Sequence, residues 1–343
     1  MKIRPQKTED GNMIINAEKR RILSGMRPTG KLHLGHYLGA LKNWITLQNE
    51  YDCFFEIADL HALTENAEKK DVKSMSFELT LDYLSVGIDP KKATIFVQSE
   101  VREHSELHLL LSMITPVSWL ERCPTYKDQV SQLNLGPNVT YGLLGYPVLM
   151  TTDIVLYKSD RVPIGKDQLP HLELSREIVR RFNFLFNKDV FPEPEALLTE
   201  IPLLSGLDGR KMSKSYNNFI LLSEEEKDLW EKIRNMVTDP ARIKKDDPGH
   251  PDICTVYSYH KIFSFNECDE IESDCKGGNI GCVACKKKLF SNIETIIAPF
   301  REKRKKLSLE PDFIEDILSE GRKKAAEIAG KTIAEVKEAI KIR

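Results

Sequence analysis

The sequence predicts an α/β protein in which a parallel sheet is followed by a mainly helical region. Up to about residue 215, short apolar runs alternate with helix-length periodic segments, which is the pattern of a parallel sheet with crossover helices. Beyond residue 216, long charged segments carry apolar residues three and four positions apart, which is typical of amphipathic helices.

The composition is that of an ordinary globular protein. The 343 residues are 41% hydrophobic, and 50 basic against 52 acidic residues leave a net charge of -2. This length suggests roughly two domains of about 100–200 residues each. The near-neutral balance excludes a simple nucleic-acid coat protein, so any RNA contact is expected to be regional. Because the sequence has neither a long apolar stretch nor a secretory signal, we expect a cytoplasmic protein without membrane contact.

The expected elements begin after a polar N-terminal extension at 1–20, which lacks periodicity. The first strand covers 21–24 and leads through a turn rich in glycine and proline at 25–30 into a helix. Apolar runs then predict two further strands with a helix between them, at 53–58, 94–98 and 72–86.

A third unit completes the predicted sheet domain. It contains three short apolar runs and then an amphipathic segment, at 146–150, 153–157, 162–165 and 168–182. We therefore expect a sheet domain with a connecting helical insertion at 21–215. A helical domain at 216–343 follows, with long helices near 224–236 and 310–343.

The first motif, PTGKLHLGH at 28–36, lies between the first strand and its helix. In a doubly wound sheet, ligands bind at the carboxyl ends of the strands, where a helix N-terminus attracts phosphate. His33 and His36 add ring N–H donors for phosphate oxygens, and Gly35 lets a flat base lie against the backbone. These features indicate a nucleotide site.

The second motif, KMSKS at 211–215, follows the glycine-containing segment GLDGR. Two lysines with intervening hydroxyls suit a flexible clamp for a polyphosphate, whose charge must be neutralised as it leaves. Either motif alone is compatible with an ordinary surface loop. Their occurrence in this order, on either side of a sheet domain, favours a shared nucleotide chemistry.

The pair HLGH and KMSKS resembles the two signatures of class I aminoacyl-tRNA synthetases. The longer segments SGMRPTGKLHLGHYLGALKNW, DLHALT and GIDP are similar to tryptophan–tRNA ligases, and the resemblance runs from about Arg21 to the C-terminus. It implies a Rossmann-like catalytic domain that activates L-tryptophan with ATP and Mg²⁺ and passes it to tRNA(Trp). It also implies a helical anticodon-binding domain and a homodimer.

The resemblance further implies the site residues. The catalytic set would be His33, His36, Lys211, Ser213 and Lys214. ATP would contact Arg27, Gly35, His36, Gly165, Lys166, Asp167, Lys211, Met212, Ser213, Lys214 and Ser215. Asp153 would accept the indole N–H, because indole is only a donor. Met150 would line the ring, and Tyr146, Gln168 and His61 would contact the backbone or ring side of the amino acid. Arg27 stands where many bacterial members carry glutamine, and an arginine supplies a stronger phosphate ligand.

Five of the seven cysteines fall between Cys254 and Cys285, which in a reducing compartment points to a metal. Cys282 and Cys285 can chelate one centre with Cys275 nearby, and Cys254 or Cys268 would be the fourth ligand. The residues alone fit either tetrahedral zinc or a [4Fe-4S] cluster. Resemblance to a subgroup of tryptophan–tRNA ligases implies the [4Fe-4S] cluster, with ligands Cys254, Cys275, Cys282 and Cys285. Cys268 would then be spare, and Cys53 and Cys123 are expected to be inert core thiols.

Basic stretches at 286–288 and 301–306 are expected to contact the RNA backbone. Because the two nucleotide motifs belong to the sheet domain, loss of Cys282 or Cys285 is expected to spare adenylate formation and to impair transfer to tRNA.

Two other functions are compatible with parts of the sequence. A tyrosine–tRNA ligase shares both signatures, but its pocket must satisfy a phenol hydroxyl that donates and accepts. An iron–sulfur protein that binds RNA without ligase activity would have no reason to retain two phosphate-binding motifs. Pyrophosphate exchange with each amino acid separates these functions.

Overall fold

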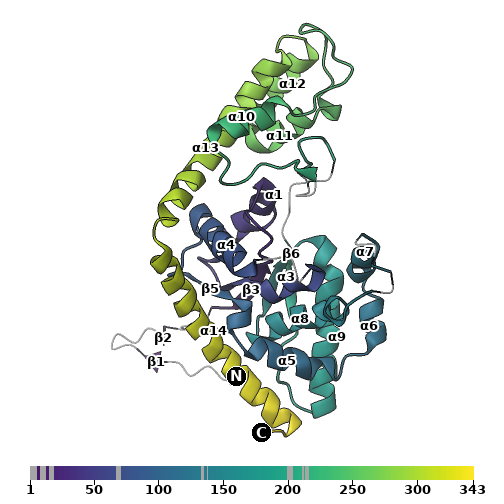
Figure 1. Cartoon of the computed structure of the whole chain (residues 1–343), viewed down its shortest axis with the longest axis vertical. Helices are drawn as coiled ribbons and strands as arrows, with labels where there is room; N and C mark the ends of the chain where they lie inside the picture. Colours follow the sequence, from purple (N-terminus) through teal and green to yellow (C-terminus); the bar gives the residue numbers. More distant parts are fainter. Residues whose placement is uncertain are drawn as a thin grey trace.

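A five-stranded parallel sheet forms the centre of the protein (Figure 1). The computed structural model describes residues 6–7, 13–14, 19–66, 71–132, 135–136, 138–198, 204–210, 212 and 216–343. The strands are β3 (Arg21–Met26), β4 (Asp52–Ile57), β5 (Ala93–Val97), β6 (Arg161–Ile164) and β7 (Glu195–Leu198). Their order is β5-β4-β3-β6-β7, and every neighbouring pair is parallel. The predicted α/β fold class is thereby confirmed. The chain turns to opposite sides of β3, which creates the switch point where such sheets bind ligands.

The two faces of the sheet carry separate apolar cores, because successive strand residues point to opposite faces. On β4, for example, Phe55 belongs to the first core and Phe54 to the second. The helices that contribute to the first core include α4 (Val72–Val86), α10 (Glu226–Arg234) and α13 (Cys282–Leu307). The second core includes residues of α5 (Glu103–Ser112), α8 (Tyr141–Leu156), α9 (Leu169–Phe186) and α14 (Pro311–Ile340).

Helix α4 shows how local sequence fixes an element. The Asp71 side chain accepts a hydrogen bond from the Ser74 N–H at 3.1 Å, which caps the helix N-terminus. At the other end, Gly87 adopts a left-handed φ of 113°, a conformation that stops the helix. The observed bounds agree with the predicted helix at 72–86.

The remaining elements are short. Within the N-terminal extension, β1 (Gln6–Lys7) and β2 (Met13–Ile14) pair antiparallel. The helix after β3 consists of α1 (Leu34–His36), the π-helical turn η1 (Tyr37–Leu41) and α2 (Lys42–Leu47). The others before residue 200 are α3 (Asp59–Asn66), η3 (Gln98–Glu100), α6 (Val117–Glu121), α7 (Pro124–Gln132) and η4 (Lys166–Gln168). Among the described residues, none of the helices is long and apolar enough to cross a membrane.

The chain beyond residue 216 is helical, as predicted, and its last helix returns to the sheet. It adds η6 (Pro251–Ile253), α11 (Thr255–Phe263), η7 (Phe265–Glu267) and α12 (Cys268–Lys276) to α10, α13 and α14. Figure 1 shows α13 running from α10, α11 and α12 to the sheet, with α14 continuing along it to the C-terminus. Helix α14 packs so closely on β5 that a Cβ on Gly321 would overlap the Ile95 carbonyl oxygen.

The third unit of the sheet differs from a simple succession of apolar runs. Of the runs at 146–150, 153–157 and 162–165, only the last forms a strand, β6. The first two belong to the single helix α8. This helix is buried on nearly all sides, so its sequence lacks the polar stripe that would reveal a helical period. The edge strand β7 was not predicted, because its four residues carry no long apolar run.

Candidate functional site

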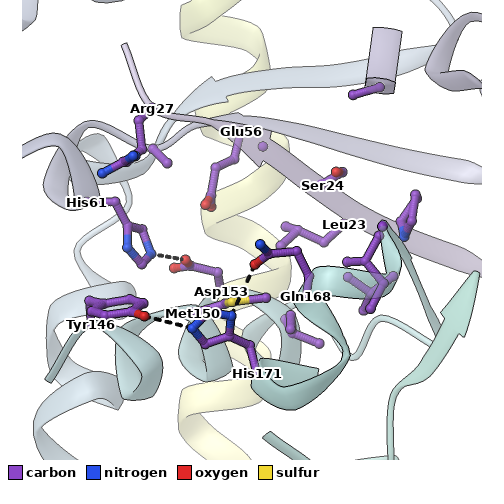
Figure 2. A pocket seen from close by; sticks show the side chains of 18 of the residues that line it. Leu23, Ser24, Arg27, Glu56, His61, Tyr146, Met150, Asp153, Gln168 and His171 are labelled. Atoms are coloured by element: carbon purple, nitrogen blue, oxygen red, sulfur yellow. Dashed lines mark hydrogen bonds and ion pairs between the residues drawn. The ribbon is translucent and has the colours of Figure 1, made fainter. Parts of the chain in front are cut away.

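A cavity of about 430 Å³ opens at the carboxyl ends of β3, β4 and β6 (Figure 2). This is where the sheet changes direction and where ligands are expected. All five residues predicted to contact the amino acid line it, namely His61, Tyr146, Met150, Asp153 and Gln168. Of the residues predicted to contact ATP, Arg27 and Gly165 also line the cavity.

Asp153, on α8, is the polar centre of the cavity. His61 Nε2 donates to its Oδ2 at 2.8 Å, while His104 Nδ1 and Gln98 Nε2 donate to its Oδ1 at 2.8 and 2.7 Å. Burial favours the neutral acid, but the two histidines outweigh it and hold the pKa of Asp153 well below its ordinary value. The group is a carboxylate of fixed orientation. Oδ1 accepts two of these hydrogen bonds and Oδ2 only one, so Oδ2 is the oxygen that keeps most acceptor capacity.

A second network holds Tyr146 and Gln168 through His171, which also lines the cavity. The Tyr146 hydroxyl lies 2.7 Å from His171 Nε2, and Gln168 Oε1 lies 3.1 Å from His171 Nδ1. Burial raises the pKa of Tyr146 to about 12, so its hydroxyl stays neutral and can donate or accept. The two networks place several polar side chains and one carboxylate around the same space.

The two predicted nucleotide motifs meet at Gly35. The rings of His33 and His36 lie with centroids 3.7 Å apart at the start of α1. A Cβ on Gly35 would lie 3.1 Å from Met212 Sδ, so Met212 of the second motif is a direct neighbour of the first. After the second motif, the Leu34 N–H donates to the carbonyl oxygen of Ile220 at 2.9 Å. Segments nearly two hundred residues apart thus share one site.

Other predicted nucleotide contacts are less enclosed. Lys166 and Asp167 are exposed in η4, and Asp167 Oδ2 accepts a hydrogen bond from Gln168 Nε2 at 2.7 Å. Four residues of the second motif, Lys211, Ser213, Lys214 and Ser215, lie outside the described residues.

Sequence reasoning missed three buried polar residues beside Asp153: Glu56, Gln98 and His104. A signal existed, because Glu56 interrupts the apolar strand CFFEIA and a buried polar group requires compensation. The sequence does not reveal which distant residue compensates it.

Known proteins resemble this chain over nearly its whole length. Residues 16–298 match the family model described as tRNA synthetases class I (W and Y). The chain belongs to this family. A tryptophan–tRNA ligase of Thermotoga maritima is 50% identical over 326 residues, covering 94% of this chain and 99% of that protein. A tryptophan–tRNA ligase of Aquifex aeolicus is 44% identical, covering 94% and 100%. The crystal structure of tryptophanyl-tRNA synthetase from Campylobacter jejuni, complexed with ADP and tryptophan, has a TM-score of 0.85 at 35% identity, covering 94% and 100%.

In this class I synthetase, four cysteines gather at the N-terminus of α13. Cys254, Cys275, Cys282 and Cys285 line one small cavity, whereas the Cys268 Sγ lies 3.4 Å from a tyrosine hydroxyl outside it. Burial, and then the other three thiols of the group, raise the pKa of Cys285 to about 12. Because a metal ligand must be a thiolate, a bound metal would have to supply positive charge here.

The four thiols can be compared with the donor sets of zinc and of a [4Fe-4S] cluster. Among the described residues, no three of these sulfurs lie within 4.8 Å of one another. A single tetrahedral zinc, with Zn–S bonds of about 2.3 Å, brings its sulfurs to roughly 3.8 Å apart. A [4Fe-4S] cluster binds each thiolate through a different iron and therefore separates the sulfurs more widely. The four cysteines supply the thiol donors that either centre requires.

Part of the basic sequence of α13 is not available to RNA. Lys286 donates to two backbone carbonyls at 2.7 and 2.8 Å, Arg301 pairs with Glu294, and Arg304 pairs with Asp82. These three basic residues are buried, so the expectation that both basic stretches face RNA is wrong for them. The exposed lysines of the same stretches are Lys287, Lys303, Lys305 and Lys306.

Proposed function

We propose that this class I synthetase activates L-tryptophan with ATP and transfers it from tryptophanyl-adenylate to tRNA(Trp). The observation that carries the proposal is the buried Asp153 carboxylate. Three donors hold it inside the cavity, and it keeps acceptor capacity for an indole N–H. The relatives that are 44% and 50% identical over 94% of the chain are named tryptophan–tRNA ligase, which supports the same assignment.

In the proposed complex, the amino acid occupies the cavity of Asp153. The indole N–H donates to this carboxylate, and the ring lies against Met150. Tyr146, Gln168 and His61 contact the backbone or ring side of the amino acid. These assignments are supported by the position of all five side chains on the cavity wall.

Adenylate formation needs no covalent intermediate with the enzyme. A carboxylate oxygen of tryptophan attacks the α-phosphorus of ATP, which enters with Mg²⁺. The bond from that phosphorus to the bridging oxygen breaks, and pyrophosphate leaves with the electron pair. Positioning and charge stabilisation supply most of the acceleration. A terminal ribose hydroxyl of tRNA then attacks the activated carbonyl, and AMP leaves.

We assign the nucleotide contacts by charge and position. His33, His36 and Arg27 contact the phosphates, Gly35 faces the base, and Gly165, Lys166 and Asp167 hold the ribose. The pyrophosphate is held by the second motif, Lys211, Met212, Ser213, Lys214 and Ser215. The position of Met212 Sδ, 3.1 Å from where a Cβ on Gly35 would lie, supports a common nucleotide site for both motifs.

Pyrophosphate exchange tests the reaction and the amino acid together. We expect exchange that depends on tryptophan and is much weaker with tyrosine, since a carboxylate that is already oriented by three donors suits an indole donor. Exchange with tyrosine alone would favour the alternative ligase. A protein without exchange for either amino acid would favour the non-catalytic RNA-binding function.

Lys214→Ala tests the role of the second motif. We expect adenylate formation to slow by about 10²–10³-fold, because one preorganised donor to the transition state is lost. Tryptophan affinity should change little, since the lysine acts on the leaving group. The control is Lys331→Ala, an exposed lysine of α14. An unchanged single-turnover rate in the Lys214 variant would contradict the assignment.

We also propose that Cys254, Cys275, Cys282 and Cys285 hold a [4Fe-4S] cluster, with zinc as the alternative metal. When bound, it would join the starts of α11 and α13 to α12. Anaerobically purified protein should contain about four irons and four sulfides per chain. Cys285→Ser should lose both, whereas the control Cys268→Ser should keep them. One zinc per chain without iron would overturn the cluster, and normal charging by metal-free protein would overturn any metal role.

A homodimer is the proposed assembly, supported by exposed apolar side chains on α5 and at its C-cap, on α6 and on α8. These are Leu109, Met113, Val117 and Tyr141, with exposures of 55–71%. Light scattering should give twice the chain mass, and Met113→Glu should lower it. A monomer at all concentrations would contradict the proposal.

The domain division remains part of the proposal. Residues 21–215 would form adenylate and residues 216–343 would bind tRNA, although α14 also supports the sheet. The 1–20 extension has no assigned role. We expect the enzyme to act in the cytoplasm, where charged tRNA is used.

A further inference from the structure

Glu56 is a buried acid that has no part in the proposed reaction. It lies on β4, is 3% exposed and lines the cavity. Its Oε2 has no hydrogen-bond partner among the described residues. The neighbouring strand makes room for it, because a Cβ on Gly25, its register partner on β3, would lie 2.8 Å from Glu56 Cγ. The fold thus accommodates a carboxyl group where an apolar side chain would ordinarily pack.

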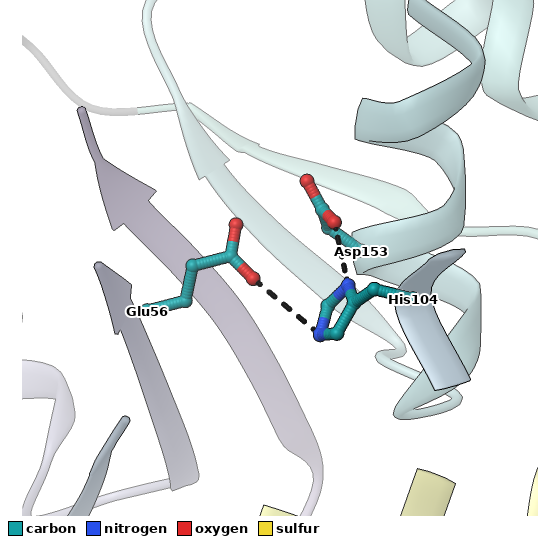
Figure 3. A group of neighbouring side chains, drawn as sticks. All are labelled: Glu56, His104 and Asp153. Atoms are coloured by element: carbon teal, nitrogen blue, oxygen red, sulfur yellow. Dashed lines mark hydrogen bonds and ion pairs between the residues drawn. The ribbon is translucent and has the colours of Figure 1, made fainter. Parts of the chain in front are cut away.

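The basic groups around Glu56 do not neutralise it. Among the described residues, His104 is the basic side chain that comes within 4.0 Å of Glu56 Oε2, which is beyond hydrogen-bond distance (Figure 3). Both nitrogens of His104 have other partners, since Nδ1 donates to Asp153 and Nε2 lies 2.8 Å from the Tyr157 hydroxyl. The cluster of Glu56, His104 and Asp153 is also a poor metal site, because both ring nitrogens of His104 already have other partners.

A second carboxyl group lies close to Glu56. Polar atoms of Glu56, His104 and Asp153 all lie within 4.8 Å of one another. Two buried carboxylates at this separation cannot both ionise. Asp153 keeps the charge, because three donors already point at it. Burial, followed by the charge of Asp153, raises the pKa of Glu56 well above its ordinary value. The proton therefore resides on Glu56, which can donate.

We propose that Glu56 is a positioning residue of the tryptophan site, whose carboxyl O–H donates a hydrogen bond to Asp153 and holds that carboxylate in place for the indole N–H. The identity of the ligand rests on the proposed function. The proton on Glu56, which is donated to Asp153, does not depend on it. One carboxylate beside one neutral acid suits a neutral N–H donor. Two carboxylates would repel each other and disturb the orientation of Asp153.

Loss of the proton from Glu56 should therefore weaken tryptophan binding at high pH. The titratable and charged groups that face Glu56 come from every neighbouring element: Arg27 after β3, Asp59 and His61 on α3, Tyr83 on α4, His104 on α5, and Asp153 and Tyr157 from α8. Because several of them titrate, the informative quantity is the difference between wild type and a variant that changes Glu56 alone.

Two substitutions separate the hydrogen bond from packing. Glu56→Gln keeps a donor of the same length but cannot ionise, and Glu56→Met keeps the volume without a donor. At neutral pH, Glu56→Gln should keep the tryptophan KM within about threefold, and Glu56→Met should raise it about tenfold or more, with a smaller change in kcat. Above neutral pH, the wild-type KM should rise relative to that of Glu56→Gln. The proposal would be overturned if both variants changed the tryptophan KM equally. It would also be overturned if the ratio of the wild-type KM to that of Glu56→Gln did not change with pH.

The proton itself has two readouts that do not depend on catalysis. The infrared spectrum at neutral pH should contain a carbonyl band of a protonated carboxyl group that is absent from Glu56→Gln. Glutamate in the unfolded chain ionises near pH 4.3, so folding of the wild type takes up a proton above that pH. The Tm of the wild type should then fall relative to that of Glu56→Gln as the pH rises. If the band and the shift are present but tryptophan does not support exchange, the proposed function fails and the shared proton stands. If the carbonyl band and the Tm shift are both absent, Glu56 does not hold the proton and the proposal fails.

Discussion

Replacing Arg304 by methionine should destabilise the protein through Asp82, a buried carboxylate that joins α13 to the first motif. Arg304 Nε donates to Asp82 Oδ1 at 2.6 Å, and the Leu32 N–H donates to Asp82 Oδ2 at 2.7 Å. The two side chains are 10% and 1% exposed. Methionine fills a similar volume but supplies no donor, so Asp82 would keep a buried charge without its partner.

The size of the effect is limited by protonation of Asp82. A buried charge that has lost its partner costs about 3–5 kcal/mol. Neutralising a carboxyl of ordinary pKa near 3.9 at pH 7 costs roughly 4 kcal/mol, which sets the upper bound. At ~2 °C per kcal/mol, the Tm should fall by about 6–8 °C. Burial already raises the pKa of Asp82. Toward about pH 4 the neutral acid forms readily, so the loss in stability should shrink.

Thermal unfolding followed by circular dichroism, near pH 7 and near pH 4, measures both effects. The double variant with Asp82→Asn should recover most of the loss, because asparagine is neutral and still accepts from the Leu32 N–H. Lys303→Met, at an exposed position of the same helix turn, is the control. A loss of equal size at both pH values, or a double variant that loses the sum of the two single effects, would refute the reasoning.

Three other substitutions test separate contacts. Asp153→Asn should raise the tryptophan KM in pyrophosphate exchange by roughly 10-fold or more, because one buried hydrogen bond to a charged group is worth about 1.5–3 kcal/mol; an unchanged KM would contradict the site. Tyr259→Phe removes a hydroxyl that donates at 2.8 Å to the carbonyl oxygen of Ser205, in the segment before the second motif. Single-turnover adenylate formation should therefore slow, whereas the control Tyr257→Phe on the same helix should not slow it. Gly321→Ala should lower the Tm by several degrees, because its Cβ would meet the backbone of β5. Gly330→Ala, whose Cβ would make only an ordinary contact at 4.0 Å with Glu103 Oε1, should instead raise the free energy of unfolding by about 0.5–1 kcal/mol; equal effects would contradict the close packing of α14.

The sequence was most informative where function depends on consecutive residues. The motifs around His33 and Lys211 carry their chemistry in short segments, so their charge, hydroxyl and glycine content indicate phosphate binding without knowledge of the fold. Strands β3, β4 and β5 were equally clear, because each is an apolar run of strand length between turns or helices. In these segments local pattern and tertiary position agree.

Prediction failed where a residue depends on partners far along the chain. The family resemblance indicates Asp153, but its donors Gln98 and His104 come from different elements about fifty residues away. Glu56 is another 97 residues from Asp153, and only the sheet brings the two acids together. A single polar residue in an apolar segment indicates a buried polar network. The periodicity of the sequence, however, does not reveal which distant residues are its partners. The sequence did not predict helix α8 for a related reason. The helix is buried on nearly all sides, so it has no polar face that would reveal a helical period.

Helix α11 makes contacts with distant segments that the sequence does not reveal, and these contacts bear on the function of the cysteines. Cys254 is its N-cap, and the next residue, Thr255, has its Oγ1 3.1 Å from where a Cβ on Gly209 would lie. One turn later, the Tyr259 hydroxyl donates to the carbonyl oxygen of Ser205. Distance in sequence led to the expectation that loss of the cysteine group would spare adenylate formation. These contacts argue against such independence, because a shift of α11 displaces the residues that lead directly into the second motif. Loss of the group should therefore slow adenylate formation as well as transfer to tRNA.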